Sequence, residues 1–251
     1  MSGHSKWSTI KRKKGANDAK RGKIFTRLAR ELTLAAREGG GDPDSNISLR
    51  LAISRAKAEN MPNDNIDRAI KRGTGEDKDG VTIEEVTYEG YGPHGIALII
   101  ESVTDNRNRA VSEIRHALNK AGGSMGETGS VGWQFTRTAY FALSAEDADY
   151  DDVFMLVADA GAEDVTTDGE SIEITGPVET FKTIGDQLRL ASLNPDDAGL
   201  RMLPNHELTL DPSQTVQVMK LIEALEDLDD VQNVYSNLSI TDEALAAMEA
   251  A

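Results

Sequence analysis

The sequence of 251 residues is long enough for two or three domains of ordinary size. It contains no cysteine, which excludes disulfides and thiolate metal sites, and its 5% aromatic content requires mostly aliphatic cores. The longest strictly aliphatic run, residues 96–100, is far shorter than the roughly 20 residues of a membrane span. Residues 1–7 (MSGHSKW) lack the apolar stretch of a secretory signal, although a basic, acid-poor start can also resemble an organelle transit peptide. We therefore expect a cytoplasmic protein.

The net charge of −16 conceals a strong asymmetry along the chain. Residues 1–75 contain 17 Lys and Arg against 8 Asp and Glu, a net charge of +9. Residues 76–251 contain 10 against 35, a net charge of −25. Clustered positive charge at one end indicates a polyanionic partner, which the acidic remainder would repel, so we expect binding through one end of the molecule. The alternative is that the basic part docks on the acidic part of its own chain.

The start of the chain has the pattern of a basic arm followed by three helices. Residues 1–15 contain no acid, and the helix predicted over 16–38 has an apolar stripe on one face and a cationic stripe on another. Glycines 39–41 end this helix, and a second helix is predicted from residue 44 or 45 to about residue 60. The third begins after Pro62 and is predicted to end at Gly73, as the glycine that follows a helix C-terminus. Residues 74–80 are polar and glycine-rich, as in a linker.

The rest of the chain alternates between β-leaning and helical segments. Strands are predicted over residues 81–88, 96–103, 132–136, 139–143, 164–167, 171–175 and 231–235. Helices are predicted over residues 107–120, 151–160, 177–193 and 213–228. The glycine-rich stretch 122–132 follows a helix and precedes a strand, the reverse of a dinucleotide-binding turn, and could be tight turns or a loop that touches a partner. Residues 162–165 and 228–231 resemble each other, through a shared architecture or by chance.

The basic arm and the cationic face of the first helix form the principal candidate nucleic-acid-binding site. Nucleic-acid backbones attract clustered Lys and Arg mainly through counterion release. Trp7, within the arm, could stack on an exposed base or pack as a core residue. A second, weaker contact surface is predicted on helix 107–120, formed by Arg107, Arg109, His116 and Lys120. Each basic surface could instead be an ordinary solvated helix face.

Patterns typical of catalysis or metal binding are weak in this sequence. The glycines before Lys23 have the wrong spacing for a phosphate-binding loop, and Ile24 stands where that motif requires Ser or Thr. No nucleophile elbow is present, and the histidines show no metal-ligand spacing; they are His4, His94, His116 and His206. We therefore expect no catalytic residue, no metal, no cofactor and no enzymatic activity.

Several sequence strings closely resemble the YebC/PmpR family, in the same order and over essentially the whole chain. They are SGHSKW (2–7), DAKRGKIF (18–25), GGGDPDSN (39–46), PNDNIDRAIKRG (62–73), YEGYGPHG (88–95), TDNRNRAVSEIRHA (104–117) and GSVGWQF (129–135). The family includes organellar relatives known as translational activators of cytochrome c oxidase. Its members are commonly described as DNA-binding transcriptional regulators, and others bind ribosomal RNA and relieve stalling on sequences such as consecutive prolines.

The resemblance implies an α+β multidomain fold, with an N-terminal three-helix domain followed by two ferredoxin-like α+β domains, the third inserted in the second. The expected boundaries are residues 1–78 for domain one, 79–136 plus 207–240 for domain two, and 137–206 for domain three. It also implies a cytoplasmic protein without a cofactor. The family's basic N-terminal residues correspond here to Lys6, Trp7, Lys11, Arg12, Lys13, Lys14, Lys20, Arg21, Lys23, Arg27 and Arg30. The middle of the arm, residues 8–17, varies among members.

The expected function is therefore non-enzymatic, nucleic-acid-binding regulation of gene expression, and the resemblance favours DNA-binding regulation of transcription. The alternative is a ribosome-associated, RNA-binding regulator of translation, which the absence of a clear helix-turn-helix pattern and the one-ended charge distribution favour. A protein-interaction module is the second alternative. The expected partner is promoter DNA or ribosomal RNA, without membrane or small-molecule substrate, and the protein is expected to be a monomer in isolation.

Overall fold

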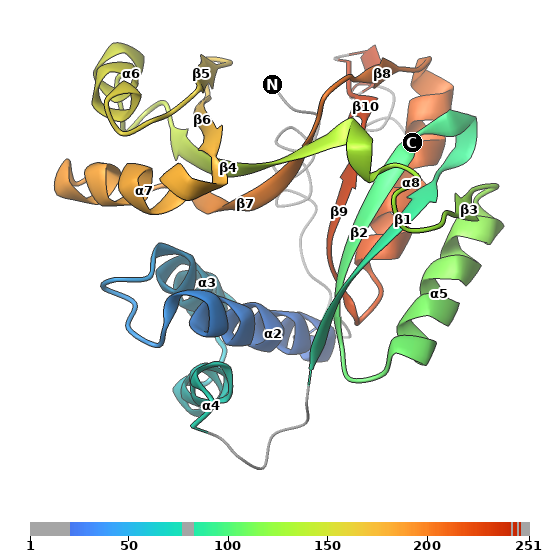
Figure 1. Ribbon diagram of the computed structural model, residues 1–251, viewed down its shortest axis with the longest axis horizontal. Coiled ribbons are helices and arrows are strands. Elements are labelled where there is room, and N and C mark those ends of the chain that lie inside the picture. Colours follow the sequence, from blue (N-terminus) through green and yellow to red (C-terminus); the bar gives the residue numbers. More distant parts are fainter. Residues whose placement is uncertain (1–20, 77–82, 242, 245, 247–251) are drawn as a thin grey trace. The chain divides into compact units, whose positions relative to one another are not determined.

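The computed structural model describes residues 21–76, 83–241, 243, 244 and 246. They form two compact units. The first unit contains the described residues of 28–78 and 137–202, and the second contains the remaining described residues (Figure 1). Helices come first in the chain, and two four-stranded sheets with packed helices follow, which confirms the predicted α+β fold class. None of the described helices is long and apolar enough to cross a membrane.

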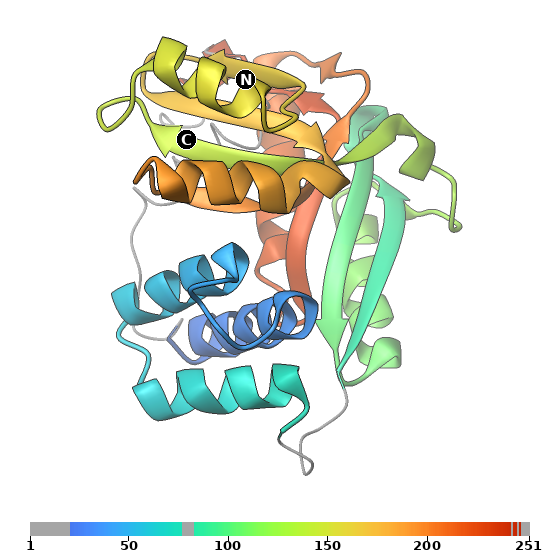
Figure 2. The ribbon, with the colours of Figure 1, turned by 60° about the vertical axis from the view of Figure 1, so that its left-hand side comes forward.

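The N-terminal helices form a small bundle (Figure 2). They are α2 (Arg21–Gly39), α3 (Ile47–Ala58) and α4 (Asn63–Thr74). The bundle core is built from buried leucines, alanines and Ile66, as the aliphatic composition predicts; the leucines and alanines are Leu28, Leu32, Leu49, Ala35, Ala36, Ala52, Ala56 and Ala69. Thr33 Oγ1 also donates a hydrogen bond to the carbonyl oxygen of Ala69 at 3.1 Å, joining α2 to α4.

Asn46 fixes the turn between α2 and α3. Its Nδ2 donates to the carbonyl oxygens of Ala35 at 2.7 Å and Gly40 at 2.9 Å, and its Oδ1 accepts the backbone N–H of Leu49 at 3.1 Å. One buried amide therefore binds carbonyls in and just after the last turns of α2 and a free N–H at the start of α3. The N-cap of the second helix is Asn46, so α3 begins slightly later than the sequence predicted.

Gly73 does not end the third helix as predicted. The helix continues to Thr74, and the residue that follows it with left-handed backbone is Gly75, with φ of 79°. A Cβ atom at Gly73 would lie 2.4 Å from the carbonyl oxygen of Thr33 and 2.7 Å from the Cβ of Ala36. Gly73 is therefore required because α4 packs very closely on α2 at this point, and not because of a positive φ.

The sheet of the first unit has the strand order β5-β6-β4-β7. Its elements are β4 (Phe135–Ser144), α6 (Tyr150–Ala158), β5 (Asp164–Thr167), β6 (Ser171–Pro177), the short helix η4 (Val178–Thr180), α7 (Phe181–Leu190) and β7 (Asp197–Pro204). Numbered within this sheet, the order is 2-3-1-4 with helices after the first and third strands, as in the ferredoxin-like fold. Val153, Val157, Ile184 and Leu188 of the two α-helices pack with strand residues in one buried cluster.

Two predictions within this sheet were wrong. The strand expected at 132–136 is wrong over residues 132–134, which form the short 3-10 helix η3. Residues 135–143 belong to one strand, β4, whose ladder with β6 runs without a break from Thr138 to Ser144. Strand β7 was not predicted, because its sequence contains Gly199 and Arg201 and has no clear alternation of apolar residues. Pairing with β4 places it in the sheet.

An ion-pair network connects α3 to β7 inside the first unit. Arg55 donates from Nη1 to Glu31 Oε1 and from Nη2 to Asp197 Oδ1, each at 2.6 Å, and Arg201 also pairs with Asp197. Burial by itself raises the pKa of Asp197, but the charges of Arg201 and Arg55 outweigh burial and hold it below the ordinary value. The carboxylate therefore stays ionised although its side chain is only 12% exposed.

The sheet of the second unit has the strand order β3-β1-β2-β9. Its elements are β1 (Glu84–Tyr91), η2 (Pro93–Gly95), β2 (Ala97–Thr104), α5 (Arg107–Lys120), β3 (Ser124–Met125), η3 (Gly132–Gln134), α8 (Pro212–Glu226) and β9 (Val231–Ser236). Strands β8 (Leu208–Thr209) and β10 (Leu238–Ser239) form a separate parallel pair. The core joins β2 and β9 to Ile114 and Leu118 of α5 and to apolar residues of α8.

Strand β9 shows that the chain returns to this sheet after building the other one. Its residues 231–236 pair antiparallel with β2, for example Val234 with Ile100, although the chain between the two strands contains all of the first unit's sheet. This return agrees with an inserted arrangement of the α+β parts. The boundaries expected at residues 78, 136 and 206 stay a prediction.

Candidate nucleic-acid interface

The principal predicted site lies mostly outside the described residues. This applies to Lys6, Trp7, Lys11, Arg12, Lys13, Lys14 and Lys20. The backbone of Arg21 and Lys23 is helical at the start of α2. Arg27 and Arg30 are half-buried, and Nη2 of Arg27 donates to the carbonyl oxygen of Gln232 at 2.7 Å. Arg27 therefore has a bond to its own chain, and contact of these residues with nucleic acid stays a prediction.

Helix α5 was predicted with its observed bounds and carries the second predicted surface. Asn106 caps its N-terminus by accepting the backbone N–H of Arg109 at 3.1 Å. Ala110, Ile114 and Leu118 are buried, whereas the cations of the helix lie on its exposed side; they are Arg107, Arg109, Arg115, His116 and Lys120. Arg115 was not among the predicted residues, although helical spacing from Ser112 and Asn119 places it on the same face.

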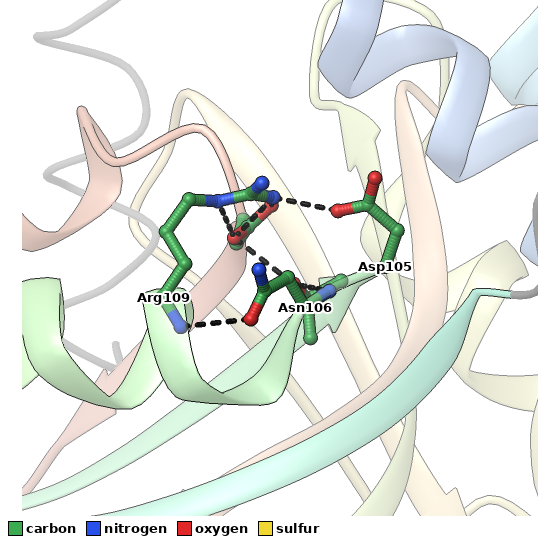
Figure 3. Close-up of polar contacts among 5 residues, drawn as sticks. Asp105, Asn106 and Arg109 are labelled. Carbon is green, nitrogen blue, oxygen red and sulfur yellow. Dashed lines mark hydrogen bonds and ion pairs between the residues drawn. The ribbon is translucent and has the colours of Figure 1, made fainter.

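Arg109 has a structural partner that the sequence did not reveal (Figure 3). Its Nη2 lies 3.0 Å from Oδ1 and 2.9 Å from Oδ2 of Asp230, and its Nε lies 3.1 Å from Oδ2. Nη2 also donates to Asp105 Oδ1 at 2.7 Å, and the hydroxyl of Thr104 donates to Asp230 Oδ2 at 3.0 Å. The Asp230 side chain is 1% exposed, so it is a buried carboxylate held by a guanidinium and a hydroxyl.

This network changes the interpretation of the second surface. Hydrogen bonds to Asp105 and Asp230 raise the pKa of Arg109, and two carboxylates offset its charge. Arg107 is 65% exposed, with Nε 3.9 Å from Glu84 Oε2, a long and solvated ion pair. The cations best placed to meet a ligand are therefore Arg107, Arg115 and Lys120, together with His116.

A loop of residues 126–134, which we call the Trp133 loop, follows β3 and is organised around Glu89. The Glu89 carboxylate accepts backbone N–H bonds from Gly129 at 2.7 Å, Val131 at 2.7 Å and Gly132 at 2.8 Å. Partial burial alone raises the pKa of Glu89, but these three bonds outweigh it and hold the pKa below the ordinary value. The ionised carboxylate of Glu89, on β1, therefore holds the backbone of the loop in place.

Trp133 is the most exposed large apolar side chain in this loop. It is 71% exposed, whereas Val131, two residues earlier, is fully buried. The sequence had indicated that the glycine-rich stretch could touch a partner but did not single out Trp133. The available signal was a tryptophan surrounded by glycines and small polar residues, where neither strand nor helix periodicity assigns it to a core.

Among the described residues, no group of three or more His, Asp or Glu side chains is placed to hold a metal ion. His94 is exposed, and its Nε2 lies 3.0 Å from Gln217 Oε1. Besides the basic N-terminal part predicted from the sequence, the exposed face of α5 and the Trp133 loop are candidate ligand-binding surfaces among the described residues.

Comparison with known families assigns both parts of the chain. Residues 5–76 match the family model described as TACO1/YebC protein N-terminal domain, and residues 83–238 match the one described as TACO1/YebC second and third domain. The chain belongs to the TACO1/YebC family. The resemblance noted from the sequence strings is thereby confirmed.

Several curated TACO1/YebC relatives align with nearly the full chain. A protein of Desulfosudis oleivorans is 52% identical over 96% of this chain and 98% of its own, and one of Geotalea uraniireducens is 50% identical over 99% and 100%. Both are named "Probable transcriptional regulatory protein". The crystal structure of the conserved hypothetical protein Aq1575 from Aquifex aeolicus matches with a TM-score of 0.78 and 40% identity, over 91% of this chain and 94% of that one.

Proposed function

We propose that this protein is a nucleic-acid-binding regulator of gene expression that engages phosphates through its basic N-terminal part. The observation that carries the proposal is the segregation of charge, +9 in residues 1–75 against −25 in the remainder. A bundle that needed its cations only for solubility would not require such an excess beside an acidic body. The relatives' name, which refers to transcription, supports regulation and favours DNA as the target.

The charge pattern of the described bundle supports contact with the nucleic-acid backbone, in preference to insertion of α4 into a groove. The exposed side of α4 carries Asp64 and Asp67 as well as Arg68 and Lys71. A recognition helix in the major groove would bring those two carboxylates close to phosphates, which is unfavourable. This observation favours ribosomal RNA as the second candidate target, bound by shape and charge at one end of the protein.

Salt-dependent binding of charge-neutralised variants tests the proposal. If about 5–8 phosphates are engaged, the logarithm of the association constant should fall against log salt with a slope of roughly −4 to −7 for the unaltered protein. Replacing Lys11, Lys13, Lys14 and Lys20 by glutamine should make the slope shallower by about 3–4, because about 0.9 counterion is released per phosphate neutralised. Binding would be measured with duplex DNA and with a ribosomal RNA fragment.

The matched control removes as many cations from the acidic part of the chain. Exposed residues suited to replacement by glutamine are Arg137, Lys182, Arg189 and Lys220. This control should bind as the unaltered protein does, or slightly more weakly. An equal loss of nucleic-acid affinity in both variants would show a general charge effect and refute a localised binding site. Crosslinking in growing cells then separates the targets, because promoter fragments would indicate transcription and ribosomal RNA would indicate translation.

A further inference from the structure

The Trp133 loop holds an aromatic ring outward on a fixed backbone. Glu89 accepts three N–H groups of the loop, and the hydroxyl of Tyr91 donates to the carbonyl oxygen of Ser130 at 3.1 Å. Nδ2 of Asn205 donates to the carbonyl oxygen of Trp133 at 3.1 Å. Strand β1 and the segment before β8 therefore restrain both the loop and the residue that carries the ring, which lowers the entropy lost on binding.

The ring itself offers a π-face with no polar atom left to satisfy. Nε1 of Trp133 donates to the carbonyl oxygen of Ser130 at 3.1 Å, so the indole N–H is used within the loop. The side chain remains 71% exposed despite this bond. An aromatic face that is both fixed and uncovered can gain favourable contact area only from a ligand that stacks on it.

The surroundings of Trp133 fit a nucleobase better than an apolar protein surface. Protein-binding patches usually gather several apolar and aromatic side chains in a continuous area. The rest of the loop consists of glycines, small polar residues, Glu127, Gln134 and the buried Val131. A single aromatic among small polar residues is the arrangement by which single-stranded nucleic acids are bound, since every base has a π-face.

We propose that Trp133 is a stacking residue for an unpaired base of single-stranded or structured nucleic acid, with Glu89 as the positioning residue that holds the loop. The proposal rests on the nucleic-acid-binding function proposed above and adds a second point of contact within the α+β part of the chain. Duplex DNA is excluded as the ligand of this loop unless a base leaves the stack, because paired bases have no free face.

Cations of α5 lie along the same stretch of chain and can neutralise the phosphates of a stacked nucleotide. Arg115 and Lys120 are exposed, and the chain passes from Lys120 through β3 directly into the loop. Strand β3 contacts α5 and pairs with β1 at Gly90 and Tyr91, adjacent to Glu89. Together these elements combine an aromatic platform with backbone-neutralising charge, the two components of single-strand binding surfaces.

Fluorescence of a single-tryptophan variant tests the proposal directly. The sequence contains two tryptophans, Trp7 and Trp133, so Trp7→Phe leaves Trp133 as the sole indole emitter. Titration with a homopolymeric single-stranded RNA should quench this emission and protect it from acrylamide, whereas the matching duplex should leave it largely unchanged. Trp133→Ala should weaken single-strand binding roughly 5- to 150-fold, the range for loss of one base–aromatic stack. Trp133→Phe should retain most of the affinity.

The outcomes separate this inference from the proposed function. If the unaltered protein binds RNA with a steep salt dependence but RNA leaves the Trp133 emission unchanged and Trp133→Ala binds as tightly as the unaltered protein, the stacking role is wrong and the N-terminal site stands. If no nucleic acid binds at any salt concentration, the proposed function fails and the inference falls with it. If Trp133→Ala no longer bound a protein partner but still bound nucleic acid with unchanged affinity, the stacking role would also be wrong. Circular dichroism of Trp133→Ala checks that an exposed substitution leaves the fold intact.

Discussion

Replacing Arg109 by alanine should destabilise the second unit more than replacing its partner, Asp230. Removal of the guanidinium takes an ion-pair partner from a carboxylate that is 1% exposed, and breaking a buried pair in this way typically costs about 3–5 kcal/mol. The Arg109 side chain is 42% exposed, so water already weakens the pair. The hydroxyl of Thr104 still donates to Asp230 in the variant. We therefore expect a loss near the lower end, about 3 kcal/mol in the free energy of unfolding.

Asp230→Ala should lower the free energy of unfolding by less, about 1–3 kcal/mol, because the Arg109 guanidinium that loses this partner is not buried. Arg109 keeps its bond to Asp105 at 2.7 Å and is accessible to water. The main penalty is the buried hydroxyl of Thr104, which loses its acceptor. The double variant should lose about 1–3 kcal/mol less stability than the sum of the two single losses, since each single change already removes the same contact.

Urea denaturation followed by circular dichroism gives the free energies, and hydrogen exchange at β2 and β9 locates the loss, because Thr104 and Asp230 lie at the ends of these strands. Arg115→Ala is the matched control on the same helix, exposed and expected to change stability by less than about 0.5 kcal/mol. If Arg109→Ala were as stable as this control, or if the two single losses were additive, the buried-carboxylate argument would be refuted.

Three further outcomes follow from the contacts described above. Gly73→Ala should lower stability by about 1–3 kcal/mol in thermal denaturation, despite the better helix propensity of alanine, because its Cβ would lie 2.4 Å from the Thr33 carbonyl oxygen. The lowered pKa of Asp197 means that its stabilising contribution is present above the ordinary carboxyl pKa and disappears as pH falls through the lowered value. Asp197→Asn should therefore cost about 2–4 kcal/mol at neutral pH and show a smaller loss on acidification, measured by denaturation at several pH values. Glu89→Gln offers one acceptor oxygen to three N–H groups, so the protection of the amides of residues 129, 131 and 132 against exchange, relative to their intrinsic rates, should fall. In the unaltered protein the same loss of protection should occur only as pH falls through the lowered pKa of Glu89.

Elements whose structure follows from local pattern were predicted well from the sequence. Helix 107–120 has its predicted bounds because its apolar period, its cap and the glycine after it all agree. The roles of Asn46 and Gly73 were not predicted. Asn46 is a cap because its amide also reaches the carbonyl oxygens of Ala35 and Gly40, and Gly73 is needed because another helix approaches it. Both roles depend on packing between helices, which no local signal encodes.

The candidate site was only partly predictable for the same reason. Sequence periodicity placed Arg109 on the exposed side of α5, and it does lie there, but its partner Asp230 is 121 positions away in the chain. Nothing in either segment indicates the pairing before the register of β2 with β9 is known. Trp133 was overlooked for the opposite reason, since its loop has no periodicity and is held by residues of other elements, Glu89 above all.

The acidic side chains of the α+β parts bear on whether the basic arm docks on its own chain. Many of these carboxylates already bind backbone N–H groups or arginines. Asp149 caps α6, Asp211 caps α8, and Asp168 accepts the N–H groups of Glu170 and Ser171. Asp197 and Asp230 hold arginines. Such positions follow from the needs of helix ends, turns and buried pairs, so these carboxylates have structural roles of their own.

The same distribution limits where a polyanion can touch the α+β parts. Ionised caps and turns keep their negative charge, so phosphates near α6, with Asp151 and Asp152 exposed in its first turn, would be repelled. The exposed face of α5 differs, because Arg115 and Lys120 extend from it and Arg109 compensates Asp230 internally. Within the α+β parts, α5 and the Trp133 loop therefore offer a phosphate backbone a more favourable contact than α6 does. Glutamate in place of Arg115 and Lys120 should weaken binding in addition to the loss from the arm, and unchanged affinity in that variant would confine the interface to residues 1–75.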